Sequence, residues 1–510
     1  MKTFNRSVMA SFVLAMSSTT ALAEGMTLAD VVTKTLDTHP EYLQSEQLVE
    51  SARQGIVQAK AGYLPTVDLT LGVGYERIEN ESTINRSIVD PNRHGDADSD
   101  RQEATLTVTQ MLFDGFATPA RVERSRAEFQ NQVSFNKEIA EKVAVASTNA
   151  FYSVLREQTN LVVDEQNLRM HKNYQKQIQR RVRSGKSNKA DLEQVNSRVA
   201  LAESQVVQRE ELLEQAKSNF FRQVGVEAEN LIANEVDYAL IPASLEEAVE
   251  VAYSNNPRIK SLEAASEASE SSVKEAKAAY MPTVNLELSA SRNQNINGID
   301  KKDQSEQAMV RMRYNLFNGG ADKARHLASI AERDAADQSL ADTKRAVERD
   351  VRSGWYEYQL TSKRLASLSA QVRAAKATKI AYKSQFDVGQ RTLLDVLDSE
   401  REYNSARITL QTAKLARDYS VYQLLALMGN LTDTFTPDEV ILDIEEAVEV
   451  EVNEPTAEEL ALIEAKELEA ENIEPALGEP AMAVEPELSE EEAKRFDMIV
   501  EDINNLDYAR

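Results

Sequence analysis

Residues 385–398, QFDVGQRTLLDVLD, interrupt a helical pattern that otherwise extends from residue 321 to residue 428. A segment in which polar and apolar residues alternate, 280–317, precedes that pattern. Alternation indicates β-strands, whereas long stretches with few glycines or prolines indicate α-helices. The sequence therefore predicts a β-hairpin followed by a long helical hairpin whose tip lies at residues 385–398.

The same succession of patterns occurs earlier in the chain, so the sequence contains an internal duplication. The sequence GYLPTV at 62–67 corresponds to AYMPTV at 279–284, and LFDG at 112–115 corresponds to LFNG at 316–319. The offset between these positions is 217 residues before the hairpin loop and 204 residues after it, so the first loop carries about 13 additional residues. A repeat of this length is a duplicated half of the protein and not a short solenoid unit.

The acidic charge of the chain is concentrated at its C-terminus. The 510 residues carry a net charge of −26, and residues 438–510 contain 25 Asp and Glu against 4 Lys and Arg, which accounts for about −21. The preceding part is nearly balanced, as in an ordinary folded protein. The chain has no cysteine, which excludes disulfides, thiolate metal sites and a lipidated N-terminal cysteine.

Residues 1–23 have the features of a secretory signal peptide. Lys2 and Arg6 supply the positive charge, an apolar core follows at 8–16, and Ala21-Leu22-Ala23 forms a cleavage site. The core is too short for a membrane anchor, which needs roughly 20 apolar residues. Because no later apolar run is long enough either, a membrane role would have to come from β-strands. Nucleic acid is not an expected partner of an exported acidic chain.

The alternating segments predict strands with one apolar face. The first hairpin is expected to pair residues 65–75 with residues 104–112 across a polar loop. In the second, the apolar side chains of Val310, Met312, Tyr314 and Leu316 alternate with Arg311, Arg313 and Asn315. Strands of about 10 residues with one apolar face fit a transmembrane β-barrel, and they also fit a soluble hairpin with one face on a core.

The helical segments are unusually long. Residues 120–184 contain neither glycine nor proline and would form a helix of roughly 100 Å at 1.5 Å per residue. Helices of this length imply coiled-coil-like packing of helix pairs. Four strands cannot close a barrel, and open sheet edges are not stable in lipid. Membrane strands would therefore require several chains to share one barrel, with the helical hairpins forming a tube that continues it.

These patterns divide the chain into five parts. The predicted organisation is a signal peptide, 1–23; a first repeat, 24–225, with a helix, a β-hairpin at 63–113 and a helical hairpin at 118–224; a linker, 226–243; a second repeat, 244–431, with a helix, a β-hairpin at 280–317 and a helical hairpin at 321–428; and an acidic, largely disordered tail, 432–510, with a terminal amphipathic helix at 489–507.

The signal, the duplication, the LFDG and LFNGG turns and the sequence VGQRTLLDVLD at 388–398 resemble the TolC family of outer-membrane channels. The resemblance covers about residues 26–431. It implies an α+β membrane protein and a homotrimer, in which four strands per chain form a shared 12-stranded barrel and the helical hairpins form a periplasmic α-barrel. It also implies a channel without enzymatic activity or cofactor, surrounded by outer-membrane lipid, whose partners are a periplasmic adaptor and an inner-membrane transporter.

The second tip contains two aspartates, Asp395 and Asp398, that share one helix face. The resemblance assigns them to acidic rings that narrow the periplasmic entrance, with Arg391 helping to hold it shut and Asp191 as a further gate-region aspartate. Alternatively, the aspartates are solvated carboxylates favoured by the helix dipole, or a general acid/base pair. No metal site is expected, because the four histidines show no ligand spacing.

The two tips are also candidates for docking an adaptor. Basic residues cluster at the first tip, where a solvated helix end is the alternative interpretation. Ala190 and Phe386 depart from the hydroxyl residue and the tyrosine that the family often has there. The predicted docking residues are Gly185, Arg183, Lys186, Val388, Gly389 and Thr392.

Together with this resemblance, the sequence predicts a trimeric outer-membrane export duct of a type I secretion system. The absence of a lipidation cysteine and the sequence QMLFDG at 110–115 favour this branch of the family. A multidrug or metal efflux channel is an alternative within the same class. An alternative from another class is a soluble periplasmic coiled-coil scaffold.

Overall fold

The structure, a computed structural model, describes residues 25–89, 97–233, 236–297 and 299–435. The predicted signal peptide at 1–23 and the predicted tail helix at 489–507 lie outside these residues.

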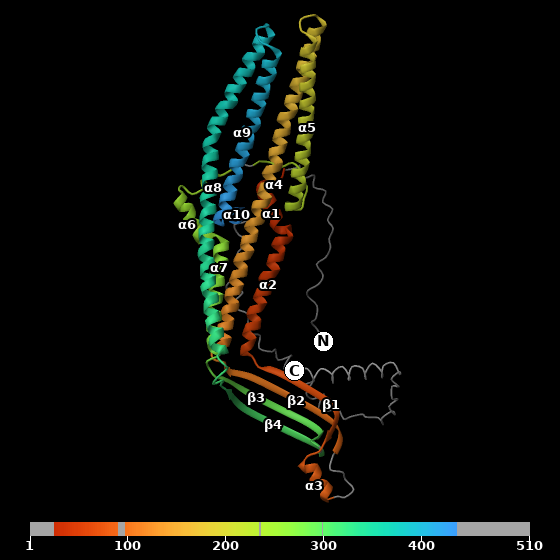
Figure 1. The fold of residues 1–510 in the computed structure, drawn as a ribbon, viewed down its shortest axis with the longest axis vertical. Helices are drawn as coiled ribbons and strands as arrows, with labels where there is room; N and C mark the ends of the chain where they lie inside the picture. The colour runs from red at the N-terminus through yellow and green to blue at the C-terminus, as the bar shows by residue number, and fades with distance from the viewer. Residues whose placement is uncertain (1–24, 90–96, 234–235, 298, 436–510) are drawn as a thin grey trace, which may run out of the picture. The chain divides into compact units, whose positions relative to one another are not determined.

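Each repeat contains two short helices, a β-hairpin and two long helices, and the first repeat has one more short helix in its hairpin loop (Figure 1). The first contains α1 (Leu28–Thr38), α2 (Pro40–Lys60), the 3-10 turn η1 (Ala61–Tyr63), β1 (Thr66–Ile78), α3 (Glu81–Val89), β2 (Ala97–Phe113), α4 (Ala117–Arg183) and α5 (Lys189–Val224). The second contains α6 (Leu245–Asn255), α7 (Pro257–Ala278), β3 (Thr283–Ile296), β4 (Ile299–Arg313), α8 (Ala321–Asp387) and α9 (Leu393–Met428), followed by α10 (Leu431–Phe435). The 3-10 turn η2 (Tyr238–Leu240) lies between the repeats.

The long helices show the duplication directly. Helices α4 and α8 both have 67 residues, and α5 and α9 both have 36. In each repeat the two long helices pack against each other as a hairpin, and the two hairpins meet through α4 and α9 (Figure 1). The predicted helical hairpins are thus confirmed, and α5 and α8 form the outer members of the set.

The four strands form one antiparallel sheet in the order β1-β2-β3-β4. Its register places apolar side chains in rows on one face, such as Val67, Val108, Leu288 and Ala308. The neighbouring row on the other face is Asp68, Thr107, Ser289 and Gln307. The apolar face lies open in the single chain, where Val67 is 64 % exposed and Met312 is 66 % exposed. The predicted alternation of faces is therefore present across all four strands.

The strand bounds differ from those predicted from alternation. Strand β2 begins at Ala97, several residues before the predicted start, because its pairing with β1 continues through polar residues to Ile78. Backbone hydrogen bonds do not require apolar side chains, so alternation alone underestimates such a strand. Strand β4 ends at Arg313, which leaves Tyr314 and Leu316 outside the sheet, contrary to prediction.

The first hairpin loop contains a helix, α3, where the sequence predicted only a polar loop. Asn80 and Thr83 form reciprocal hydrogen bonds at its start. The Asn80 side chain accepts from the Thr83 N–H at 3.0 Å, and the Thr83 hydroxyl accepts from the Asn80 N–H at 2.9 Å. Asparagine favours both turns and helix N-caps, so its presence in the loop did not distinguish between the two.

The main apolar core lies where the two repeats meet. It combines side chains from α1 and from all helices from α4 to α10, and the largest fully buried ones include Phe151, Phe220, Leu424 and Met428. Gly354 of α8 lies against this region, and a Cβ there would approach Leu427 to 3.0 Å. The core thus joins the two duplicated halves into one folded unit. Among the described residues, no helix has an apolar stretch long enough to cross a lipid bilayer.

A buried glutamate of α4 holds the start of α10. The Glu141 carboxylate is 6 % exposed and accepts hydrogen bonds from the N–H groups of Leu431 and Thr432, at 3.2 and 3.0 Å, and from the Thr432 hydroxyl at 2.6 Å. Burial raises the pKa of Glu141 to about 7, and these hydrogen bonds oppose the rise. A carboxyl whose pKa is higher in the folded state stabilises the fold fully below its unfolded pKa, and this contribution is lost as the pH rises through about 7.

We expect Glu141→Gln to remove a pH dependence of stability. The wild-type protein should lose on the order of 1–3 kcal/mol between pH 4.5 and pH 8 through this one group. The variant should lose less, since glutamine is neutral throughout. Thermal unfolding of the purified protein at several pH values measures the difference. Glu128→Gln, an exposed site on the same helix, should keep the wild-type slope. Equal slopes for wild type and Glu141→Gln would contradict the prediction.

Candidate functional site

The two helical tips have the same backbone geometry. Gly185 and Gly389 follow α4 and α8 with φ values of 75° and 82°, which glycine adopts without the strain of a Cβ. At the first tip, the Lys186 N–H donates to the carbonyl of Arg181 at 2.8 Å. At the second, the Gln390 N–H donates to the carbonyl of Gln385, also at 2.8 Å. Both tips are therefore Schellman motifs, which satisfy the last carbonyls of each helix.

Each returning helix begins with a capping box. The Asn188 side chain accepts from the Asp191 N–H at 2.8 Å, and the Thr392 hydroxyl accepts from the Asp395 N–H at 3.3 Å. In return, the Asp395 carboxylate accepts from the Thr392 N–H at 3.1 Å. Side-chain and backbone hydrogen bonds from Thr392 lower the pKa of Asp395. In the single chain, Asp191 and Asp395 thus serve as helix-capping residues. The role of Asp395 in an acidic ring, and that of Asp191 as a gate-region aspartate, stay predictions.

Asp398 forms ion pairs with two arginines. Its carboxylate lies 3.2 Å from the Arg198 guanidinium on α5 and 3.6 Å from that of Arg401 on α9. The side chains of Asp395 and Asp398 are 36 % and 43 % exposed, so both remain open to solvent or to a neighbouring chain. The hydrogen bonds from Thr392 lower the pKa of Asp395, whereas a carboxyl that acts as a general acid needs a raised pKa.

Arg391 folds back onto its own hairpin. Its Nε donates to the Gln385 side chain at 2.9 Å, and its guanidinium lies 4.1 Å from the centre of the Tyr382 ring. Its distance to the Asp395 carboxylate is 3.9 Å, which makes a loose ion pair. Arg391 is therefore beside the predicted aspartate, but its closest contacts within the chain are to Gln385 and Tyr382.

The tips of the two hairpins contact each other through Phe386. Its ring is 7 % exposed and packs in a second apolar cluster with residues of α4, α5 and α9, including Ile178, Val195 and Val396. The Arg181 guanidinium of α4 lies 4.5 Å from the ring centre. The phenylalanine that departs from the family pattern thus joins the hairpins by packing and by a cation–π contact. Sequence reasoning missed this contact, because nothing in the spacing relates Arg181 to Phe386.

The six predicted docking residues are all exposed, including Val388 at 70 %. No atom lies within 4 Å of the Cβ position of Gly185 or Gly389. These residues are therefore free for contact with another protein.

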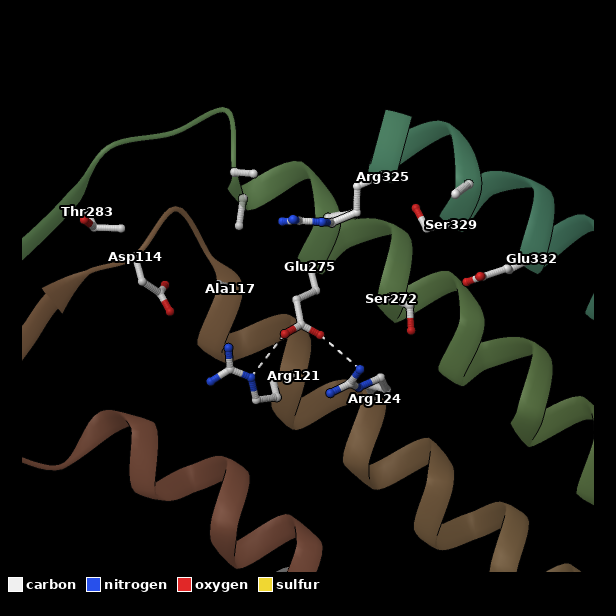
Figure 2. A pocket seen from close by; sticks show the side chains of 14 residues that line it. Asp114, Ala117, Arg121, Arg124, Ser272, Glu275, Thr283, Arg325, Ser329 and Glu332 are labelled. Atoms are coloured by element: carbon white, nitrogen blue, oxygen red, sulfur yellow. Dashed lines mark hydrogen bonds and ion pairs between the residues drawn. The ribbon is translucent and has the colours of Figure 1, made fainter. Parts of the chain in front are cut away.

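A separate cavity of about 570 Å³ lies where the strands join α4, α7 and α8 (Figure 2). The Glu275 carboxylate lies between Arg121 at 3.1 Å and Arg124 at 3.3 Å. These ion pairs connect the first turns of α4 to the last turns of α7. No group of three or more His, Asp or Glu among the described residues is arranged to hold a metal ion.

Residues 31–226 and 248–430 match the sequence profile of a family described as "Outer membrane efflux protein". The alkaline protease secretion protein AprF of Pseudomonas aeruginosa is 22% identical over 388 residues, which cover 74% of this chain and 79% of that protein. The outer membrane protein TolC of Vibrio cholerae is 22% identical over 420 residues, covering 80% and 91%. The crystal structure of the CmeC outer membrane channel of Campylobacter jejuni has a TM-score of 0.69 and 13% identity, covering 83% of this chain and 89% of that one.

Proposed function

Because this chain belongs to the family of outer membrane efflux proteins, we propose that it forms the outer-membrane duct of a type I secretion system. The protein is an outer-membrane channel and not an enzyme. Membership in this family rules out the alternative interpretation as a soluble periplasmic scaffold. In the proposal, three chains form the duct, and protein cargo passes through it from an inner-membrane transporter and a periplasmic adaptor to the exterior.

The observation that carries the proposal of a multichain duct is the open sheet. Strands β1 and β4 are its edges, and one of its faces is apolar. An edge strand in lipid would leave backbone N–H and C=O groups without partners, at a cost of several kcal/mol each. Pairing of β4 with β1 of a neighbouring chain removes this cost. Three chains would then close one barrel of 12 strands, with the apolar face toward lipid and the polar face toward the lumen.

The helical part supports the same assembly. Helices α5 and α8 flank the set because the two hairpins meet through α4 and α9. Both flanks expose large apolar side chains: Val207 and Phe221 on α5 are 63 % and 50 % exposed, and Leu360 and Ile380 on α8 are 57 % and 58 % exposed. Contact between α5 of one chain and α8 of the next would bury these side chains and continue the barrel as a helical tube.

Secretion is favoured over efflux by the similarity to an alkaline protease secretion protein. The second candidate function, a multidrug or metal efflux channel, is favoured by the family description itself. The two differ in what passes through the duct, and export experiments separate them.

We expect a strain that lacks this chain to lose one or more proteins from its culture medium. Its sensitivity to drugs, detergents and metal ions should change little. Proteomics of the medium, with growth inhibition measured in parallel, tests both outcomes, and complementation with the wild-type chain is the control. Increased drug sensitivity with an unchanged set of secreted proteins would contradict secretion and support efflux.

Two methionines of β4 test the orientation of the sheet. Met312 lies on the apolar face opposite Val284, and Met309 lies on the polar face opposite Glu287. Met312→Arg should lower the yield of assembled protein, since an arginine facing lipid is unfavourable, by about 2–4 kcal/mol at the bilayer midplane and by less toward the interfaces. Met309→Arg should change this yield little, because an arginine at that position would face the lumen. Outer-membrane yield of the trimer measures both, and equal yields would contradict the proposed orientation.

Replacing the two aspartates by neutral residues tests the predicted acidic entrance. Three chains would bring together three copies each of Asp395 and Asp398, and such a ring attracts cations. Asp395→Asn with Asp398→Asn should weaken block by multivalent cations in planar-bilayer recordings. Arg391→Ser should raise the conductance by loosening the closed state.

Glu193→Gln, which neutralises an exposed carboxylate near the first tip, serves as the control for this experiment. It lies outside the predicted ring and should keep the wild-type block. Wild-type block in the doubly neutralised channel would show that the aspartates act only as helix-capping and surface residues.

A further inference from the structure

A buried carboxylate lies at the contact between the two helical hairpins. The Glu400 side chain of α9 is 0 % exposed, and its Oε2 lies 2.7 Å from the Nζ of Lys379 on α8. Its Oε1 accepts a hydrogen bond of 3.3 Å from the Tyr174 hydroxyl on α4. The ammonium of Lys379 also lies 4.7 Å from the centre of the Tyr403 ring. These residues therefore connect three long helices of the chain.

The duplication shows which part of this arrangement is specific to the second hairpin. With the offset of 204 residues, Lys379 and Glu400 correspond to Gln175 and Asn196. In the first hairpin these two amides form a neutral hydrogen bond, from Gln175 Nε2 to Asn196 Oδ1, at 3.0 Å. The same position thus holds a neutral pair in one hairpin and a buried ion pair in the other. The charged pair occurs where α9 faces α4.

The two contacts of Glu400 have different physical roles. The Lys379 ion pair lies within the second hairpin, so it compensates the buried charge whatever the position of the first hairpin. The Tyr174 hydrogen bond is the contact that crosses between hairpins. An ionised acceptor makes such a bond stronger than a bond between neutral groups. Burial raises the pKa of the Tyr174 hydroxyl, so it remains a proton donor.

A second charged contact between the hairpins is expected to contribute less. Arg198 of α5 lies 3.2 Å from Asp398 of α9, but the two side chains are 25 % and 43 % exposed. Solvent screens such a pair, and exposed ion pairs contribute little on average. Tyr174, in contrast, is 4 % exposed and packs in the apolar cluster at the tips.

We propose that Tyr174, Glu400 and Lys379 form a latch that positions the tip of the second hairpin against the first and so sets the width of the duct entrance. Glu400 follows Asp398 by two residues and Asp395 by five on the same helix, about 3 and 8 Å along its axis at 1.5 Å per residue. The latch therefore acts on the segment that carries both predicted entrance aspartates. This inference rests on the proposed function, because the entrance exists only in the assembled duct.

Tyr174→Phe separates the latch from packing, since it removes the hydroxyl and keeps the ring. Spin labels at Gln390→Cys, in a chain with no other cysteine, report the distances between the second tips in the purified assembly. We expect Tyr174→Phe to raise the population with longer distances about tenfold, as follows from losing a hydrogen bond to a charged group. Single-channel conductance should rise with it.

Two further variants provide the matched comparison. Lys379→Gln with Glu400→Asn places the neutral pair of the first hairpin into the second. It should shift the distances in the same direction at a nearly unchanged melting temperature, because a neutral pair can replace a buried ion pair with little net cost. Asn196→Ala removes the corresponding group of the first hairpin and should leave distances and conductance unchanged.

The outcomes distinguish the latch from the proposed function. Unchanged distances in Tyr174→Phe, or a change in melting temperature alone, would overturn the latch. A shift in distances without a change in conductance would also overturn it as a determinant of the entrance. Wild-type protein that gives no distance between labels in separate chains would overturn the multichain duct itself.

Discussion

The packing of α4 against α9 is the interaction on which the rest of the structure depends. Helix α4 also contacts α1, α2, α5, α7 and α10, and α6 and α8 are attached to it through one neighbouring helix. Its buried positions between residues 157 and 174 recur every three or four residues, which is the spacing of a coiled-coil seam. The polar residues at these positions are Glu157, Asn160, Asp164, Asn167, His171 and Tyr174, and Val163 is buried beside them.

This seam is polar, and three of its side chains, Glu157, Asp164 and Asn167, are paired by neighbouring helices. Arg209 of α5 donates to Glu157 at 2.8 Å and to Asp164 at 2.9 Å, and Asn404 of α9 donates to Asn167 at 2.7 Å. Paired polar groups add less stability than apolar packing, but they allow only one register between helices. Apolar clusters above and below the seam supply the stability. The hairpins are thus held at both ends and aligned between them.

The sheet and the helical flanks show that a single chain is incomplete. Among the described residues, its edge strands have no further strand beside them and its apolar face is exposed, and α5 and α8 expose apolar side chains. In the polar seam, in contrast, Glu157, Asp164 and Asn167 have partners within the chain. Two kinds of contact are therefore distinct in this chain. Polar pairing fixes the arrangement of helices within one protomer, whereas the exposed apolar surface and the open strand edges are available for association with other protomers. The proposed duct uses both.

The sequence by itself determined the duplication, the strands with one apolar face, the long helical hairpins and the positions of their tips. These features depend on local periodicity and on residues such as Gly185 and Gly389, whose conformational freedom acts within a few bonds. Alternation could not define the ends of β2, because backbone pairing continues through polar residues. Only the tertiary structure decided that Asp395 caps a helix while Asp398 pairs with Arg198, and that Glu400 is buried between Lys379 and Tyr174. Those contacts join residues up to 226 positions apart in the chain, and their strength depends on burial, which no local pattern records.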